Sequence, residues 1–250
     1  MLLAWLKAAE SVSAVIHNTT RGHVPTPPGR EPLILVNYAG SARIELLTHA
    51  DGIFSEDGDT MLNSIGLSTL AMPAIGWTYP GKRNKHLNDA YMQTHLRMGV
   101  APTAPVYASD HSLADGDPAV NALFKDYGSL FTMIRGVRWG FDRSHVVRVD
   151  PPPSQGGPLH NVFEAMDPRA APVPWTVVLA LADDSVDSVL ITLKLPFGNQ
   201  PAGCVVQLPG VQLVGEPAVI ISQEQVGQDV LIQLQARLLR GCAVLQCSLE

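Results

Sequence analysis

The pattern of apolar and polar residues divides the chain into two regions that follow different rules. After residue 160 the chain consists of short runs rich in Val, Ile and Leu. Gly, Pro, Asn or Asp separate these runs about every 8–12 residues, which is typical of antiparallel strands in a β-sandwich. We therefore predict strands at residues 175–182, 187–195, 203–210, 218–224, 229–238 and 241–249.

The first region alternates between strand-like and helix-like segments. Continuous apolar runs predict strands at 32–40, 50–56, 71–80 and 100–111, and helical spacing occurs at 2–17, 41–49, 60–70, 86–99 and 117–136. Gly99 and Gly136 are typical residues for the C-terminal ends of the helices predicted at 86–99 and 117–136. Asp117 and Pro118 suit the N-terminus of the second of these helices. Repeated β/α units indicate a parallel sheet covered by helices.

The fold class predicted from these patterns is α/β plus all-β. Residues 1–150 are expected to form a partial (β/α) barrel of about four β/α units, since four strands cannot close a barrel of eight. Residues 151–250 are expected to form an antiparallel β-sandwich. The prolines and glycines of residues 149–161 mark the linker between the two domains.

Composition and charge exclude several classes of function. Of the 250 residues, 46% are hydrophobic and 16% are charged, as in a packed globular protein. The net charge of −6 argues against a nucleic-acid partner. No apolar run reaches the ~18 residues that a transmembrane helix needs, and residues 1–17 lack the basic start of a signal peptide. We expect neither a nucleic-acid partner nor a membrane partner.

The cysteines and histidines predict no metal site and no cofactor. Cys204, Cys242 and Cys247 form no CxxC pair and do not make a disulfide framework, so we predict that they are small buried apolar residues. The histidines lack the HExxH spacing of a zinc site. No glycine-rich phosphate loop stands between a predicted strand and a helix.

Polar and aromatic residues follow each of the four predicted parallel strands. They are Asn37 and Tyr38, Glu56 and Asp57, Trp77 and Tyr79, and Asp110 and His111. Because the carboxyl ends of parallel strands meet at one edge of a sheet, we expect these side chains around one opening. Two carboxyl groups can cleave a glycosidic bond, so Glu56 and Asp110 are the candidate catalytic residues. The other six are candidate substrate-binding residues.

Each of these residues also has a structural interpretation. The acids at positions 56 and 57 suit the N-terminus of the next helix. Residues 110–111 can form a turn. The aromatic residues at 77 and 79 alternate in strand fashion and can belong to the core. The pattern alone leaves both interpretations open.

Several segments carry a resemblance to a known group of proteins. They are LILVNYAG (33–40), ADGIFSEDG (50–58), PAIGWTYPGK (73–82), GVAPTAPVYASDH (99–111) and DYGSLFTMIRGVRWGF (126–141), followed by the β-rich tail. Together they resemble the C-terminal portion of glycoside-hydrolase-type proteins, in which a (β/α)8 barrel precedes a β-sandwich, as in the α-galactosidase and raffinose-synthase-like group.

The resemblance implies a function as well as a fold. The four strands would be the fifth to eighth of such a barrel, and Glu56 would be the catalytic acid after the sixth. The other acid of that group follows the fourth strand, which this sequence does not contain. The resemblance thus implies a glycoside hydrolase, or its C-terminal portion, with a carbohydrate substrate. The alternative is a non-catalytic carbohydrate-binding or structural protein derived from a glycosidase. The open edges of a half barrel predict either a dimer or a missing N-terminal half-barrel.

Overall fold

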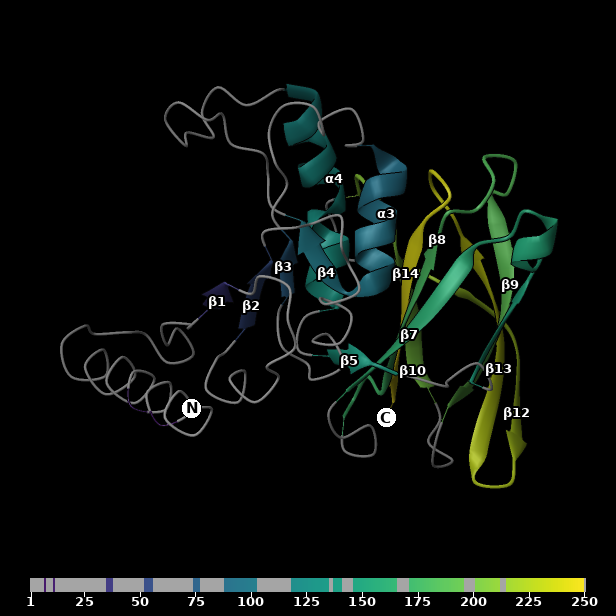
Figure 1. Ribbon diagram of the computed structural model, residues 1–250. Coiled ribbons are helices and arrows are strands. Elements are labelled where there is room, and N and C mark those ends of the chain that lie inside the picture. The colour runs from purple at the N-terminus through teal and green to yellow at the C-terminus, as the bar shows by residue number, and fades with distance from the viewer. Residues whose placement is uncertain are drawn as a thin grey trace.

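Two antiparallel β-sheets contain most of the strand residues that the structure describes. The computed structural model describes residues 7, 11, 35–37, 52–55, 74–76, 88–102, 118–134, 137–140, 146–165, 171–195, 201–211 and 215–249. Besides the two antiparallel sheets, these residues form a short parallel sheet and the helices α3 and α4 (Figure 1). Helix α3 contacts strand β4 of the parallel sheet and strands β7 and β8 of an antiparallel sheet.

The two antiparallel sheets pack face to face. The larger has six strands in the order β11 (Glu216–Pro217), β10 (Pro201–Gln207), β14 (Ala243–Leu249), β8 (Trp175–Ala180), β7 (Leu159–Ala165) and β5 (Val137–Trp139). The smaller has four strands in the order β12 (Val219–Val226), β13 (Asp229–Arg237), β9 (Ser188–Leu195) and β6 (Val147–Asp150). The antiparallel strands predicted after residue 160 are confirmed. The sheets also include β5 and β6, which precede residue 151, and the 3-10 helix η3 (Pro153–Gln155) follows β6.

Alternation along the strands decides which faces are buried. In β9 and β13 every second residue is buried, and those residues, such as Ile191 and Ile232, belong to the apolar cluster between the two sheets. Strand β8 differs because all six of its residues are buried. Its sequence, WTVVLA, is apolar except for Thr176, whose hydroxyl accepts a hydrogen bond from the amide of Gln246, as burial on both faces requires.

Helices α3 (Asp89–Met98) and α4 (Pro118–Met133) cover the outer face of the six-stranded sheet. Met92 and Leu96 of α3 and Leu130 of α4 form a second apolar cluster with side chains of that sheet, among them Phe163 and Val244. The sheet is therefore the middle layer of three: the four-stranded sheet lies on one face and the helices lie on the other (Figure 1).

The ends of α3 follow from local sequence signals. The side-chain oxygen of Asn88 accepts a hydrogen bond of 2.9 Å from the N–H of Tyr91, which caps the N-terminus. Gly99 takes the left-handed conformation (φ 73°), and its N–H bonds to the carbonyl oxygen of Leu96. The predicted stop at Gly99 is confirmed, whereas Asp117 and Gly136, the predicted ends of the next helix, lie outside the described residues.

The parallel sheet contains four strands in chain order: β1 (Leu35–Asn37), β2 (Gly52–Ser55), β3 (Ala74–Gly76) and β4 (Val100–Pro102). Each falls inside a strand predicted from the sequence, and neighbouring strands pair in parallel. The prediction of a partial (β/α) barrel, and with it a TIM-barrel architecture, is nevertheless wrong. Most of the described strands pair in antiparallel fashion. The apolar faces of α3 and α4 are buried against the six-stranded sheet. The outer face of that sheet is itself apolar, so burying it against the two helices removes apolar surface from water.

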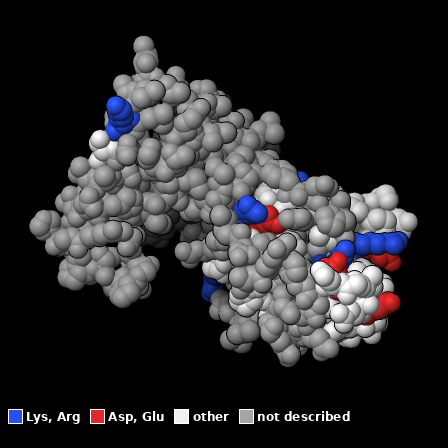
Figure 2. All heavy atoms as spheres, turned by 90° about the horizontal axis from the view of Figure 1, so that it is seen from below, with Lys and Arg blue, Asp and Glu red and all other residues white. Residues whose placement is uncertain are grey.

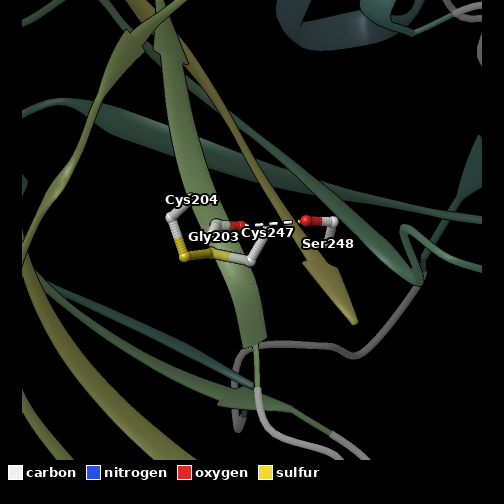
Figure 3. Close-up of a disulfide and its surroundings, with 4 residues drawn as sticks. All are labelled: Gly203, Cys204, Cys247 and Ser248. Atoms are coloured by element: carbon white, nitrogen blue, oxygen red, sulfur yellow. Dashed lines mark hydrogen bonds between the residues drawn. A yellow bond between two sulfur atoms is a disulfide. The ribbon is translucent and has the colours of Figure 1, made fainter. Parts of the chain in front are cut away.

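A disulfide joins two neighbouring strands of the six-stranded sheet (Figure 3). Cys204 of β10 lies directly opposite Cys247 of β14 in the strand register, and the two sulfur atoms are bonded. Beside them the hydroxyl of Ser248 donates a hydrogen bond of 3.3 Å to the carbonyl oxygen of Gly203. Cys242 is free and buried. The prediction that the three cysteines are buried is confirmed, but the prediction that they form no disulfide is wrong for two of them.

Candidate functional site

A pocket of about 600 Å³ opens where the chain crosses from one antiparallel sheet to the other. Strand β11, the beginnings of β9 and β12 and the end of β13 surround it. We call it the edge pocket, and its lining residues are Asp187, Ser188, Val206, Glu216, Pro217, Ala218, Val219, Gln235, Arg237, Leu238 and Leu239. Its volume lies within the range of small-ligand sites, roughly 300–1,000 Å³.

Backbone hydrogen bonds hold the walls of the edge pocket in place. The N–H of Ala218 donates to the carbonyl oxygen of Cys204 at 2.9 Å, which attaches the crossing segment to β10. The N–H of Leu238 donates to the carbonyl oxygen of Asp187 at 2.7 Å, which ties the end of β13 to the start of β9. Since Cys204 is bonded to Cys247, one wall of the pocket is also linked covalently to the centre of the sheet.

Polar side chains enter the edge pocket from alternate positions of β13. Gln235 and Arg237 are two residues apart and therefore lie on the same face of the strand. The amide of Gln235 donates a 3.2 Å hydrogen bond to the hydroxyl of Ser188, and a guanidinium nitrogen of Arg237 lies 3.4 Å from a carboxylate oxygen of Glu216. The Arg237 and Glu216 side chains are 60% and 44% exposed. Exposed ion pairs contribute only ~0–1 kcal/mol, so a ligand can separate this pair at little cost.

The edge pocket combines hydrogen-bond acceptors, donors and an apolar wall. The carboxylates of Asp187 and Glu216 accept, the guanidinium of Arg237 and the amide of Gln235 donate, and the hydroxyl of Ser188 does both. Because two carboxylates face one guanidinium, the charge of the lining disfavours phosphate and other anions. A neutral ligand with many hydroxyl groups fits this combination, since each hydroxyl both donates and accepts.

A second polar cluster joins the helices to the six-stranded sheet. The hydroxyl of Tyr127 donates to Asp89 at 2.9 Å and accepts from the amide of Gln93 at 3.1 Å. That amide also donates to the carbonyl oxygen of Arg240 at 2.6 Å, while the amide oxygen of Gln93 accepts from the N–H of Leu181 at 2.7 Å. We call this group the helix brace, because its hydrogen bonds connect α3 and α4 to the turns at the end of the sheet.

Charge and burial in the helix brace indicate a structural role. The guanidinium of Arg240 lies 3.2 Å from Asp89 and 2.5 Å from Asp126, and the hydrogen bond to Asp126 raises the pKa of Arg240. Burial raises the pKa of Tyr127 and that of the neighbouring thiol of Cys242, so both groups stay neutral. These groups are paired with one another or enclosed in the core, which suits a brace rather than a ligand site.

The structure does not test the sugar site that the sequence predicts at the ends of the parallel strands. The residues outside the described part of the chain are Glu56, Asp110, Tyr38, Asp57, Trp77, Tyr79 and His111. Asn37 is the last residue of β1, where only its backbone is described. Their convergence on one opening stays a prediction.

The polar residues of the edge pocket are absent from the candidates predicted by sequence, although two of them carry a signal. Gln235 and Arg237 occupy polar positions in the alternating run DVLIQLQAR, and a period of two places both on one exposed face. Asp187 directly precedes β9, and Glu216 belongs to β11. Only the tertiary structure brings these two carboxylates to the same hollow.

Comparisons with known proteins do not assign the chain to a family. No protein-family model matches the chain, and the curated proteins contain no significant match.

Within the described ranges, no group of three or more His, Cys, Asp or Glu side chains is placed to hold a metal ion. In the same part of the chain, no helix has the length and apolar character needed to cross a bilayer. On the face shown in Figure 2, some basic side chains of the described residues lie next to acidic ones, and others do not.

Proposed function

We propose that the chain is a non-catalytic carbohydrate-binding protein, and that its antiparallel sheets hold a sugar in the edge pocket. The observation that supports this proposal is the set of groups around a hollow of about 600 Å³: two carboxylates, a guanidinium, an amide and a hydroxyl. A pyranose ring carries hydroxyl groups around its edge, and each of them finds an acceptor or a donor there. The C–H face of the ring suits the apolar side chains of Pro217 and Val219.

Exposure of the acids favours binding over cleavage in this pocket. Asp187 and Glu216 are two carboxyl groups, which is the number that a glycosidase uses. A general acid, however, needs a carboxyl group that is removed from water. The side chain of Glu216 is 44% exposed and lies next to the guanidinium of Arg237. We therefore assign both carboxylates to hydrogen bonding with sugar hydroxyls.

A glycoside hydrolase that uses Glu56 and Asp110 is the second candidate function. One observation favours it: Glu56 directly follows β2, which pairs in parallel with β1 and β3. Ligands of parallel α/β sheets bind at the carboxyl ends of the strands. This candidate places the sugar at the parallel sheet, whereas the first places it in the edge pocket.

Binding and turnover by the full chain distinguish the two candidates. We expect glycan-array binding without sugar release, and titration calorimetry should show that Arg237→Met and Glu216→Gln each weaken binding about 10-fold or more, because charge-assisted hydrogen bonds contribute ~1.5–3 kcal/mol. Arg148→Met is the matched control, since Arg148 is an exposed residue of β6 that does not line the pocket. Equal binding by the unsubstituted protein and all three variants would overturn the proposal. So would the absence of any bound glycan. Turnover of aryl glycosides that Glu56→Gln abolishes would establish the hydrolase instead.

A further inference from the structure

The lining of the edge pocket carries more negative charge than positive charge. Its charged residues are Asp187, Glu216 and Arg237. A guanidinium nitrogen of Arg237 lies 3.4 Å from a carboxylate oxygen of Glu216, so these two charges compensate each other. In the part of the chain that the structure describes, no hydrogen bond or ion pair involves the carboxylate of Asp187. The pocket therefore holds one carboxylate whose charge no described lining residue balances.

Two strands fix the position of Asp187 beside the apolar part of the lining. Asp187 directly precedes β9, and its carbonyl oxygen accepts a 2.7 Å hydrogen bond from the N–H of Leu238 after β13. Leu238 and Val206 line the same pocket and belong to the apolar cluster between the two sheets. Apolar walls around a cleft focus the field of a charge into it. Asp187 is itself exposed, so a ligand that enters the pocket can reach its carboxylate.

On the basis of the sugar site proposed above, we propose that the bound sugar carries one amino group, and that its ammonium ion binds the carboxylate of Asp187. An ammonium group donates up to three hydrogen bonds and supplies the positive charge that the lining lacks. In an amino hexose this group replaces one ring hydroxyl. The remaining hydroxyl groups keep the amide of Gln235 and the hydroxyl of Ser188 as partners. A single amino group suffices, because Arg237 already compensates Glu216.

The charge of the lining also ranks the sugars that the pocket accepts. An amino hexose neutralises the charge of Asp187, a neutral hexose leaves it unchanged, and a hexuronate adds a second negative charge beside it. An amino hexose should therefore bind about 5-fold more tightly than its parent hexose, which is the upper end of what an exposed ion pair provides. The hexuronate should bind more weakly than the parent hexose.

Titrations of the full chain at about pH 6, below the ordinary pKa of an amino group, test this order. The probes are glucosamine, glucose and glucuronate, and the matching galactose series, with affinities taken from NMR chemical-shift changes. We expect the preference for the amino hexose to shrink at high salt, which screens the two charges. An amino hexose that binds no more tightly than its parent hexose would overturn this inference and leave the proposed sugar site intact. If none of the sugars binds, the proposed sugar site fails as well.

Two substitutions of the same kind separate the carboxylate in the pocket from the charge of the whole protein. Asp187→Asn keeps the size of the side chain and removes its charge, so glucosamine should lose its advantage over glucose. Asp184→Asn makes the same change at an exposed position in the turn before β9 that does not line the pocket, and it should retain the advantage. An undiminished advantage in Asp187→Asn, or an equal loss in both variants, would overturn the assignment of the amino group to Asp187.

Discussion

Loss of the disulfide between Cys204 and Cys247 should destabilise the protein more than the loss of two buried sulfur atoms does. The bond spans a sequence separation of 43 residues. In the chain-entropy account, closing such a loop removes ~13 cal/mol/K of entropy from the unfolded chain, which is about 4 kcal/mol at 25 °C. Folded domains are stable by roughly 5–15 kcal/mol, so this one bond supplies a large part of the total.

Urea unfolding of the double variant Cys204→Ala/Cys247→Ala measures this contribution. Fluorescence of the tryptophans, including the buried Trp175, follows the transition. Beyond the loss of about 4 kcal/mol, the m value should rise, because an unfolded chain without the cross-link exposes more surface. Cys242→Ala is the control, since Cys242 is buried but free and reports the effect of deleting a sulfur atom alone.

Two results would refute this reasoning. One is a double variant that loses no more than twice the free energy of unfolding lost by Cys242→Ala. The other concerns the bond itself: alkylation of the unfolded, unreduced protein should modify one of its three cysteines, and modification of all three would show that the bond is absent.

Three further predictions concern α3 and the helix brace. Gln93→Leu leaves the N–H of Leu181 and the carbonyl oxygen of Arg240 without the amide, so urea unfolding should show a loss of about 2–3 kcal/mol; an unchanged midpoint would contradict the brace. Burial raises the pKa of Tyr127 above its ordinary value of about 10, so the folded protein retains a proton that the unfolded chain releases, and stability should fall above about pH 10. Tyr127→Phe should reduce the slope of that fall in thermal melts, and an equal slope would count against the assignment. Asn88→Ala should cost about 1 kcal/mol through the lost cap, whereas Asn88→Ser should retain most of it in the same melts.

The local pattern of apolar and polar residues predicted most strands and both helices of the described chain. This pattern depends on which side chains of each segment are buried. Short runs rich in Val, Ile and Leu identified β13 (DVLIQLQAR) and β8 (WTVVLA). Gly99 ended α3 as expected, since a left-handed residue without a Cβ atom satisfies the last carbonyl groups of a helix. The pattern did not show what covers each apolar face. The same apolar stripes of α3 and α4 fit a parallel barrel and the outer face of an antiparallel sheet equally well.

The candidate site was less accessible to sequence than the fold. The acids and aromatic residues at the predicted strand ends, such as Glu56 and Trp77, remain predictions because they lie outside the described residues. In the part of the chain that the structure describes, the edge pocket brings together Asp187, Glu216 and Arg237 from three separate places in the chain. Nothing in the spacing of these residues indicates that they meet, since their proximity depends on how the two sheets are stacked.

The sequence by itself determined most of the described strands, the two described helices, the low net charge and the antiparallel character of the C-terminal strands. Each of these depends on contacts within a few residues or on composition alone. Only the tertiary structure decided that the helices cover the six-stranded sheet, that Cys204 faces Cys247, and that β12 is left with an unpaired edge. These features depend on which distant segments pair, and the free energy of pairing comes from surfaces that exist only once the sheets have assembled.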